Sequence, residues 1–199
     1  MPSVTLTIDR QTVTVPAGTT ILDAAKKVGV VIPTLCQFPG VSSPGSCRVC
    51  LVEVQGARTL QPSCVSTVAE GMVVRTNTKT ARDARRLSVE LLLANHPWDC
   101  NACVRNGQCE LQALAQDMGI TEVRFPYTKE KVPVDTSTPA LIRDMNKCIL
   151  CRRCVAVCQE VQGVGSLAPR ARGFDTVIGT GSGNELGEEI GRASCRERV

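Results

Sequence analysis

The stretch CILCRRCVAVCQE, residues 148–160, places four cysteines at the spacing C-x2-C-x2-C-x3-C. Cysteine runs with this spacing ligate iron–sulfur clusters, and in two-cluster proteins the fourth cysteine of such a run ligates the other cluster. We therefore expect Cys158 to serve a second cluster. The first cluster would be held by Cys148, Cys151 and Cys154, and it would take its fourth ligand from a second run of the same kind.

The composition favours metal over a conventional core. The chain has 199 residues, of which 12 are cysteine and only 3% are aromatic, although aromatic side chains usually supply much of a core. We see no signal peptide, and no apolar run approaches the ~18 residues of a membrane helix. We therefore expect a cytoplasmic protein without a transmembrane segment, in which clustered cysteines bind metal rather than form disulfides.

Residues 1–79 have the pattern of a small mixed domain. SVTLTIDRQTVTV alternates apolar and polar residues around Asp9-Arg10 and predicts a β-hairpin. TTILDAAKKVG predicts a short helix in which Thr20 and Asp23 have the spacing of a capping box. CRVCLVEVQG and GMVVRTNT predict further strands. Hairpin, helix and strands in this order suggest a β-grasp arrangement.

The remainder divides into three expected segments. Residues 80–120 contain TARDARRLSVELLLAN, which predicts a long helix capped by Thr80, and CELQALAQDMG, which predicts a second short helix. Residues 121–139 include a stretch rich in Pro, Thr and charge, and we expect a connector there. Residues 140–188 carry the cysteine run described above.

A first group of cysteines lies within the N-terminal domain. Its members are Cys36, Cys47, Cys50 and Cys64. Four thiolates in one compact domain can hold a 2Fe–2S cluster. The loop CQFPGVSSPGSCRVC is rich in small residues, which let backbone N–H groups approach sulfur atoms. The alternative is a structural zinc site, although zinc sites favour two CxxC pairs.

A second group lies in HPWDCNACVRNGQC, where Cys100, Cys103 and Cys109 supply only three thiolates. A 4Fe–4S cluster needs four ligands. His96, the only histidine of the chain, directly precedes these cysteines, and we expect it to be the fourth ligand. A neutral imidazole in place of a thiolate should raise the reduction potential. The alternative is that His96 is an ordinary surface or core residue.

Basic residues line the predicted long helix, namely Lys79, Arg82, Arg85 and Arg86. Nucleic-acid binding is disfavoured because aromatic residues to stack on bases are absent. A solvated helix face, or docking to an acidic partner subunit, explains these residues better. Arg152 and Arg153 flank the cysteine run, where they would either stabilise a reduced cluster or remain ordinary solvated arginines.

Taken in order, these motifs resemble the N-terminal iron–sulfur region of the catalytic subunit of NAD(P)-linked FeFe hydrogenases. The chain is similar, more distantly, to the large iron–sulfur subunit of NADH dehydrogenase (complex I) and to NAD-dependent formate dehydrogenases. The resemblance covers nearly all of residues 1–188 and depends on eleven cysteines and one histidine. The preference for hydrogenases depends on CVRNGQCELQ, CILCRRC and RGFDTVIG.

The resemblance implies an α+β fold in which a β-grasp 2Fe–2S ferredoxin domain precedes a small helical His/Cys cluster domain and a truncated bacterial-ferredoxin-like 4Fe–4S domain. It implies electron transfer through one 2Fe–2S cluster, one His/Cys3 4Fe–4S cluster and, in the full-length protein, one to two further 4Fe–4S clusters. The implied partners are a flavin-containing NAD(P)H-oxidising subunit, a small 2Fe–2S subunit and the chain's own missing catalytic domain. Catalysis is assigned to no residue here. A complex I-like protein would be peripheral to the inner membrane.

The last residues, IGRASCRERV, fit none of these patterns and resemble the translation of a common short-read sequencing adapter. We expect the native reading frame to break off near Glu188 and residues 189–199 to be an artefact, so that Cys195 is not a ligand. The second cysteine run would then lie beyond the break.

Overall fold

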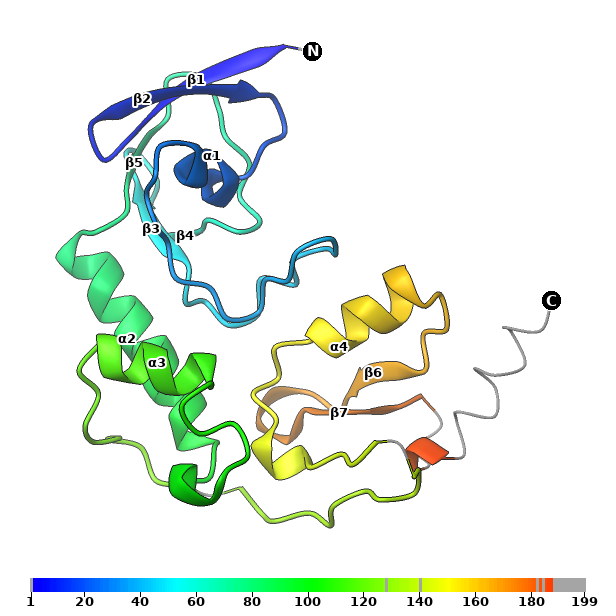
Figure 1. Cartoon of the computed structure of the whole chain (residues 1–199). Helices are drawn as coiled ribbons and strands as arrows, with labels where there is room; N and C mark the ends of the chain where they lie inside the picture. Colours follow the sequence, from blue (N-terminus) through cyan, green and yellow to red (C-terminus); the bar gives the residue numbers. More distant parts are fainter. Residues whose placement is uncertain (1, 128, 140, 182, 184, 188–199) are drawn as a thin grey trace.

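The computed structural model describes residues 2–127, 129–139, 141–181, 183 and 185–187. The interpretation of residues 189–199, including Cys195, therefore lies outside the described residues. Three regions follow one another along the chain (Figure 1): a β-sheet with one helix, a pair of helices, and a last region with a short helix and a β-hairpin.

The N-terminal region is a mixed five-stranded sheet. Its strands are β1 (Ser3–Ile8), β2 (Gln11–Pro16), β3 (Leu51–Val54), β4 (Gln61–Pro62) and β5 (Val73–Arg75). The strand order is β2-β1-β5-β3-β4, and β1 pairs with β5 in parallel. Helix α1 (Ile21–Lys27) lies against this sheet (Figure 1) and buries Ile21 and Leu22 in its core.

The predicted hairpin and its helix are confirmed. Ile8 pairs with Gln11, so Asp9 and Arg10 form a two-residue turn. Both turn residues have positive φ angles, 46° and 74°, as the turn favoured in hairpins requires. Asp9 also accepts hydrogen bonds from the backbone N–H of Thr76, at 2.7 Å, and from the Thr76 hydroxyl, which ties the turn to the end of β5.

Helices α2 (Lys79–Ala94) and α3 (Glu110–Asp117) form the second region. The helices were predicted, but the cap was wrong: the side chain of Thr78, not Thr80, accepts the backbone N–H of Ala81, at 3.2 Å. Thr78 has the extended backbone of a capping residue (φ −75°, ψ 158°), whereas Thr80 already lies inside the helix.

The solvated helix face predicted for the basic residues of α2 is wrong for Arg85. Arg82 and Arg86 are exposed, but the exposed fraction of Arg85 is 7%. Its Nε donates to the carbonyl oxygen of Leu51, at 2.8 Å, because α2 packs beside β3. Sequence periodicity does not reveal which neighbouring strand a helix face will meet.

The third region contains α4 (Arg153–Ala156), the π-helical turn η3 (Val157–Val161) and an antiparallel hairpin of β6 (Leu167–Arg170) and β7 (Val177–Thr180). Three 3₁₀ turns complete the described elements: η1 (Cys100–Ala102), η2 (Met145–Lys147) and η4 (Gly173–Asp175). Residues 121–139 contain no helix or strand among their described positions. No described helix is long and apolar enough to cross a membrane.

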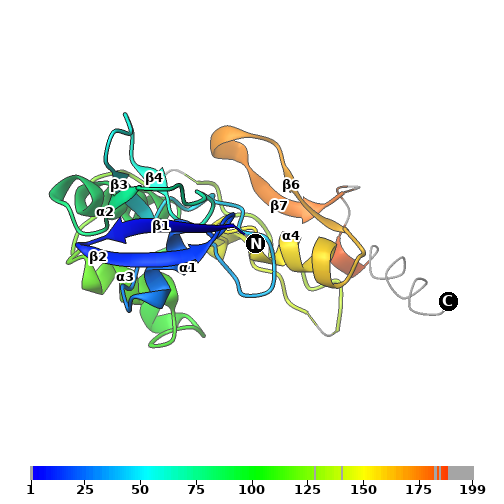
Figure 2. The same cartoon turned by 90° about the horizontal axis from the view of Figure 1, so that it is seen from above.

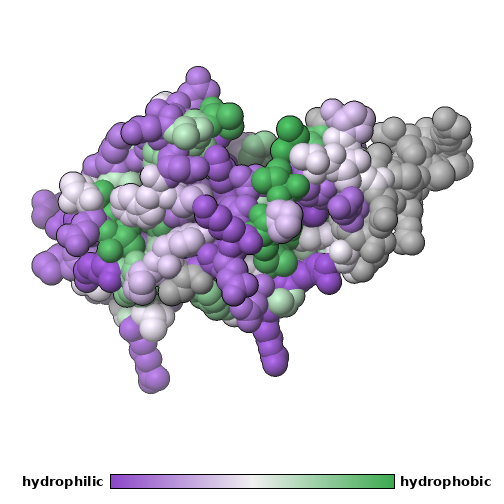
Figure 3. Space-filling model, turned by 90° about the horizontal axis from the view of Figure 1, so that it is seen from below, coloured by the Kyte–Doolittle hydropathy of each residue, from purple (hydrophilic) through white to green (hydrophobic). Residues whose placement is uncertain are grey.

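The loop between α1 and β3 reaches from the sheet toward α4 (Figure 1). Seen from above, the sheet and the β6–β7 hairpin lie on opposite sides of the molecule, with α4 below the hairpin (Figure 2). From below, the surface is mainly hydrophilic, with separate hydrophobic areas (Figure 3). The loop thus places cysteines of the N-terminal region near those of the last region.

We predict that Thr78→Ala lowers the free energy of unfolding by about 1 kcal/mol, because an orphan N–H of the first helical turn loses its acceptor. Thr80→Ala is the matched control. Thr80 is an exposed residue inside the same helix, so its replacement should have no effect or should stabilise slightly. Urea unfolding of both variants measures the difference, and the reverse order of stabilities would contradict the cap assignment.

Candidate iron–sulfur cluster sites

The first group of cysteines is brought together and buried. The exposed fractions of Cys36, Cys47, Cys50 and Cys64 are 1%, 8%, 1% and 5%. Side-chain hydrogen bonds connect Cys36 with Cys47 and Cys64, and Cys50 with Cys64. The sheet positions two of them, since Cys50 directly precedes β3 and Cys64 follows β4.

These contacts stabilise thiolates inside the protein. Hydrogen bonds from Cys47 and Cys64 hold the pKa of Cys36 well below its usual range. A hydrogen bond from Cys64 likewise lowers the pKa of Cys50 to about 6. The pKa of Cys47 and that of Cys64 are raised, first because each donates to Cys36. The thiolate is the form that binds metal.

The side-chain contacts of the four cysteines form one continuous series, Cys47–Cys36–Cys64–Cys50. Among the described residues, no three His, Cys, Asp or Glu side chains are arranged to hold a single metal ion. A structural zinc site requires four ligands around one ion, whereas a 2Fe–2S cluster divides its four thiolates between two iron atoms. A series of four adjacent thiols fits the two-iron arrangement.

The loop of the first group brings its own backbone to the sulfurs. The N–H of Cys47 donates to the sulfur of Cys36, and the N–H of Val49 donates to that of Cys47. Gly45 has a φ of +60°, and a Cβ atom there would lie 3.3 Å from a methyl group of Val65. A larger residue at this position would be strained by the backbone conformation and would need Val65 to shift, so glycine is favoured.

The second group lines a cavity of about 210 Å³. His96, Cys103 and Cys109 contribute to its walls, whereas Cys100 is exposed on η1 and does not. The Nδ1 atom of His96 is buried and has no hydrogen-bond partner within the described part of the chain. Burial lowers the pKa of His96 and so favours its uncharged imidazole. A buried, uncharged and unpartnered nitrogen beside two thiols fits a metal ligand.

The third group lies on the segment that leads into α4. Burial, followed by the charge of Cys151, raises the pKa of Cys154, and burial also raises the pKa of Cys148. The N–H of Leu150 donates to the sulfur of Cys148, at 3.4 Å. Cys158 has a different neighbour: its sulfur lies 3.4 Å from the hydroxyl of Ser166. Burial raises the pKa of Cys158, but hydrogen bonds from Ser166 and nearby backbone N–H groups outweigh it, and the net shift is downward.

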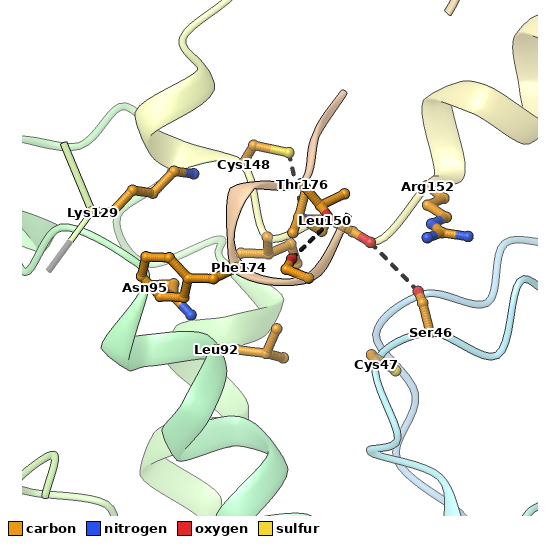
Figure 4. Close-up of a pocket in the computed structure, with 12 residues that line it drawn as sticks. Ser46, Cys47, Leu92, Asn95, Lys129, Cys148, Leu150, Arg152, Phe174 and Thr176 are labelled. Atoms are coloured by element: carbon orange, nitrogen blue, oxygen red, sulfur yellow. Dashed lines mark hydrogen bonds between the residues drawn. The ribbon is translucent and has the colours of Figure 1, made fainter. Parts of the chain in front are cut away.

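A second cavity, of about 270 Å³, lies between the first and third groups. Figure 4 shows Cys47 and Ser46 on one side of it and Cys148 and Leu150 on the other. The hydroxyl of Ser46 donates to the carbonyl oxygen of Leu150, at 3.5 Å. Phe174, from the RGFDTVIG motif, lines the same cavity.

Two ion pairs connect the second and third groups, and each charged residue is the direct sequence neighbour of a candidate ligand. The Nζ atom of Lys147 lies 3.8 Å from a carboxylate oxygen of Asp99. The Nη2 atom of Arg153 lies 2.8 Å from a carboxylate oxygen of Glu110. Sequence reasoning missed Lys147, Asp99 and Glu110, although their position next to a cysteine was a usable signal.

An apolar cluster joins all three groups. Its buried residues are Leu35, Cys36, Cys47, Val49, Val89, Leu111 and Ile120. Partly buried residues pack against it, among them Cys109 of the second group and Cys151 of the third. We call this set the junction cluster. The structure therefore brings members of the three predicted ligand groups into one continuous set of packed side chains.

Three family models match consecutive parts of the chain. The 2Fe-2S iron-sulfur cluster binding domain matches residues 2–79. The NADH-ubiquinone oxidoreductase-G iron-sulfur binding region matches residues 85–124. The ferredoxin-like domain of NADH-quinone oxidoreductase subunit 3 matches residues 138–192. The matches indicate both 2Fe–2S and 4Fe–4S clusters.

Two relatives illustrate the range of the family. The chain is 46% identical over 183 residues to the NADP-reducing hydrogenase subunit HndD of Solidesulfovibrio fructosivorans, covering 89% of the chain and 31% of that protein. It is 42% identical over 192 residues to a G-type subunit of the NADH-quinone oxidoreductase of Rhizobium meliloti, covering 96% of the chain and 22% of that protein. The chain thus spans less than a third of the length of either relative.

A solved structure supports the same assignment. A chain in the crystal structure of an NAD+-reducing [NiFe]-hydrogenase in the H2-reduced state is 35% identical, with a TM-score of 0.85. The match covers 94% of the present chain and 79% of that one. Both relatives compared above are named as subunits of oxidoreductases. As the order of its cysteine motifs predicted, the chain belongs to the family of iron–sulfur subunits shared by NADH-quinone oxidoreductases and NAD(P)-linked hydrogenases, and corresponds to their N-terminal iron–sulfur region.

Proposed function

We propose that the chain is the electron-transfer relay of a cytoplasmic NAD(P)-linked hydrogenase of the FeFe type. The observation that best supports this electron-transfer role is the junction cluster, because it packs cysteines of three ligand groups against one another. Iron–sulfur clusters, when bound, take up and release electrons at potentials set by charge, hydrogen bonds and exposure. The chain's own residues fix the relative positions of the sites and exclude water from the first of them.

The ligand sets are part of this proposal. We assign a 2Fe–2S cluster to Cys36, Cys47, Cys50 and Cys64, and a 4Fe–4S cluster to His96, Cys100, Cys103 and Cys109. A further 4Fe–4S cluster is assigned to Cys148, Cys151 and Cys154, with Cys158 serving one more in the full-length protein. The four buried and mutually hydrogen-bonded thiols support the first assignment, and the Nδ1 of His96, which has no partner among the described residues, supports the second.

The proposed domains are a β-grasp 2Fe–2S domain (1–79), a His/Cys domain (80–120), a connector (121–139) and a 4Fe–4S domain (140–188). The strand order of the sheet and the ranges of the family matches support this division. The proposed partners are a flavin-containing subunit that oxidises NAD(P)H, a small 2Fe–2S subunit and a catalytic domain.

The second candidate is the equivalent segment of an NADH-quinone oxidoreductase. It is favoured by the 42% identity to the Rhizobium meliloti oxidoreductase chain over 96% of the present chain. Such a protein would lie at the inner membrane through its partners. The sequence encoded beyond Glu188 in native DNA separates the two candidates, since the hydrogen-activating cysteine motifs of a hydrogenase differ from the downstream domain of an NADH-quinone oxidoreductase.

Anaerobic reconstitution with iron and sulfide tests the relay itself. We predict a brown protein that bleaches with dithionite and, when reduced, gives electron paramagnetic resonance signals of a 2Fe–2S and a 4Fe–4S cluster. Cys64→Ser should abolish the 2Fe–2S signal, because one iron loses a ligand, and leave the other signal. Cys158→Ser is the matched control and should leave both. A colourless, zinc-containing protein would exclude the relay.

His96 provides a separate test of the second site. We predict that His96→Cys keeps the 4Fe–4S cluster and lowers its midpoint potential, on the order of 100 mV, because a thiolate adds a negative charge. His96→Ala should lose that cluster's signal. Asn95→Ala changes the adjacent residue and should leave the potential as it is. Normal loading of His96→Ala would show that His96 is not a ligand.

A further inference from the structure

Arg85 is a buried cation that lacks a carboxylate partner. Its exposed fraction is 7%, and its Nη2 atom has no hydrogen-bond partner in the described ranges. It takes part in none of the ion pairs found between described residues. A buried charge without a counter-charge is strongly destabilising. An anionic group near Arg85 would offset this cost.

The first cysteine group is next to this side chain. The Nε atom of Arg85 donates to the carbonyl oxygen of Leu51, at 2.8 Å, and Leu51 directly follows Cys50. Burial lowers the pKa of Arg85, and the negative charges of Cys50 and then of Asp9 oppose this effect. The carboxylate of Asp9 already accepts two hydrogen bonds from Thr76. Asp83 and Asp117 line a cavity together with Arg85, but Asp83 pairs with Lys79, at 2.8 Å, and neither forms an ion pair with Arg85 among the described residues. Of the charges that act on Arg85, that of Cys50 is the strongest.

We propose that Arg85 is the buried counter-ion of the 2Fe–2S cluster and that its charge makes the reduction potential of this cluster higher than it would be without the arginine. This inference rests on the proposed 2Fe–2S site. Reduction adds one electron to the cluster and no proton, so the charge of the cluster with its four thiolates becomes more negative by one. A fixed positive charge stabilises the more negative state more strongly. Arginine does not lose its proton in proteins, so the charge is present throughout the redox cycle.

The other arginines of α2 do not meet the same conditions. Arg82 and Arg86 are exposed. One guanidinium nitrogen of Arg82 donates to the carbonyl oxygen of Asn77, at 2.7 Å, and one of Arg86 donates to that of Met118, at 3.0 Å. Water screens both charges, and Arg82 therefore provides a matched control, about one turn before Arg85 on the same helix.

The test is a potentiometric titration of the reconstituted chain, followed by the 2Fe–2S paramagnetic resonance signal. At the midpoint potential of the unaltered protein, Arg85→Met should lower the ratio of reduced to oxidised cluster at least about tenfold, which corresponds to about 59 mV for one electron. Arg85→Lys keeps the charge and should stay within roughly threefold of the unaltered ratio, as should Arg82→Met. Equal ratios for Arg85→Met and Arg82→Met would overturn the proposal.

Further outcomes separate charge from packing. If Arg85→Met does not load the cluster, Arg85→Gln, which can still donate to Leu51, replaces it in the comparison. If Arg85→Lys binds the cluster and neither neutral variant does, the positive charge is needed and the counter-ion role is supported. If none of the three variants binds the cluster, Arg85 acts through its packing and the proposal is overturned. If the unaltered protein gives no 2Fe–2S signal, the proposed function itself fails. This outcome is distinct from a failure of the Arg85 proposal, because it is seen without any variant.

Discussion

The packing of the junction cluster is the interaction on which the rest of the molecule depends. Leu35, Val49 and Val89 are almost completely buried at the point where the sheet, α2 and the cysteine segments meet. Candidate metal ligands are themselves members of the cluster. The apolar core at this point and the candidate iron–sulfur sites are therefore the same part of the molecule. This explains how a chain with 3% aromatic residues holds together. Metal binding can contribute ~10 kcal/mol in small zinc domains, comparable to the ~5–15 kcal/mol stability of a whole domain.

Polar contacts hold in place the elements that the apolar junction cluster brings together. The N–H of Ser42, in the loop of the first group, donates to a carboxylate oxygen of Glu160 in η3, at 2.8 Å. Arg85 connects α2 to β3, and the Arg153–Glu110 pair connects α4 to α3. Electron transfer requires fixed separations between sites, and these contacts supply them from residues next to the ligands.

Much of this could be predicted from the sequence because it is local. The alternation around Asp9-Arg10, the capping box at Thr20 and the cysteine spacings each depend on residues a few positions apart. The sequence does not show whether Thr78 or Thr80 caps α2, because the capping residue is the one whose own backbone is not helical. The burial of Arg85 was missed for a different reason: it depends on a strand 34 residues away.

Two ion pairs connect the second and third groups, and in both of them the basic residue belongs to the third group and the acidic residue to the second. Lys147 precedes the third group and Arg153 lies within it, whereas Asp99 precedes the second group and Glu110 follows it. An electron has a lower energy on the basic side, so the junction has an electrical direction before any partner binds. The effect is modest, because the side chains of Asp99 and Glu110 are 49% and 52% exposed and water screens them.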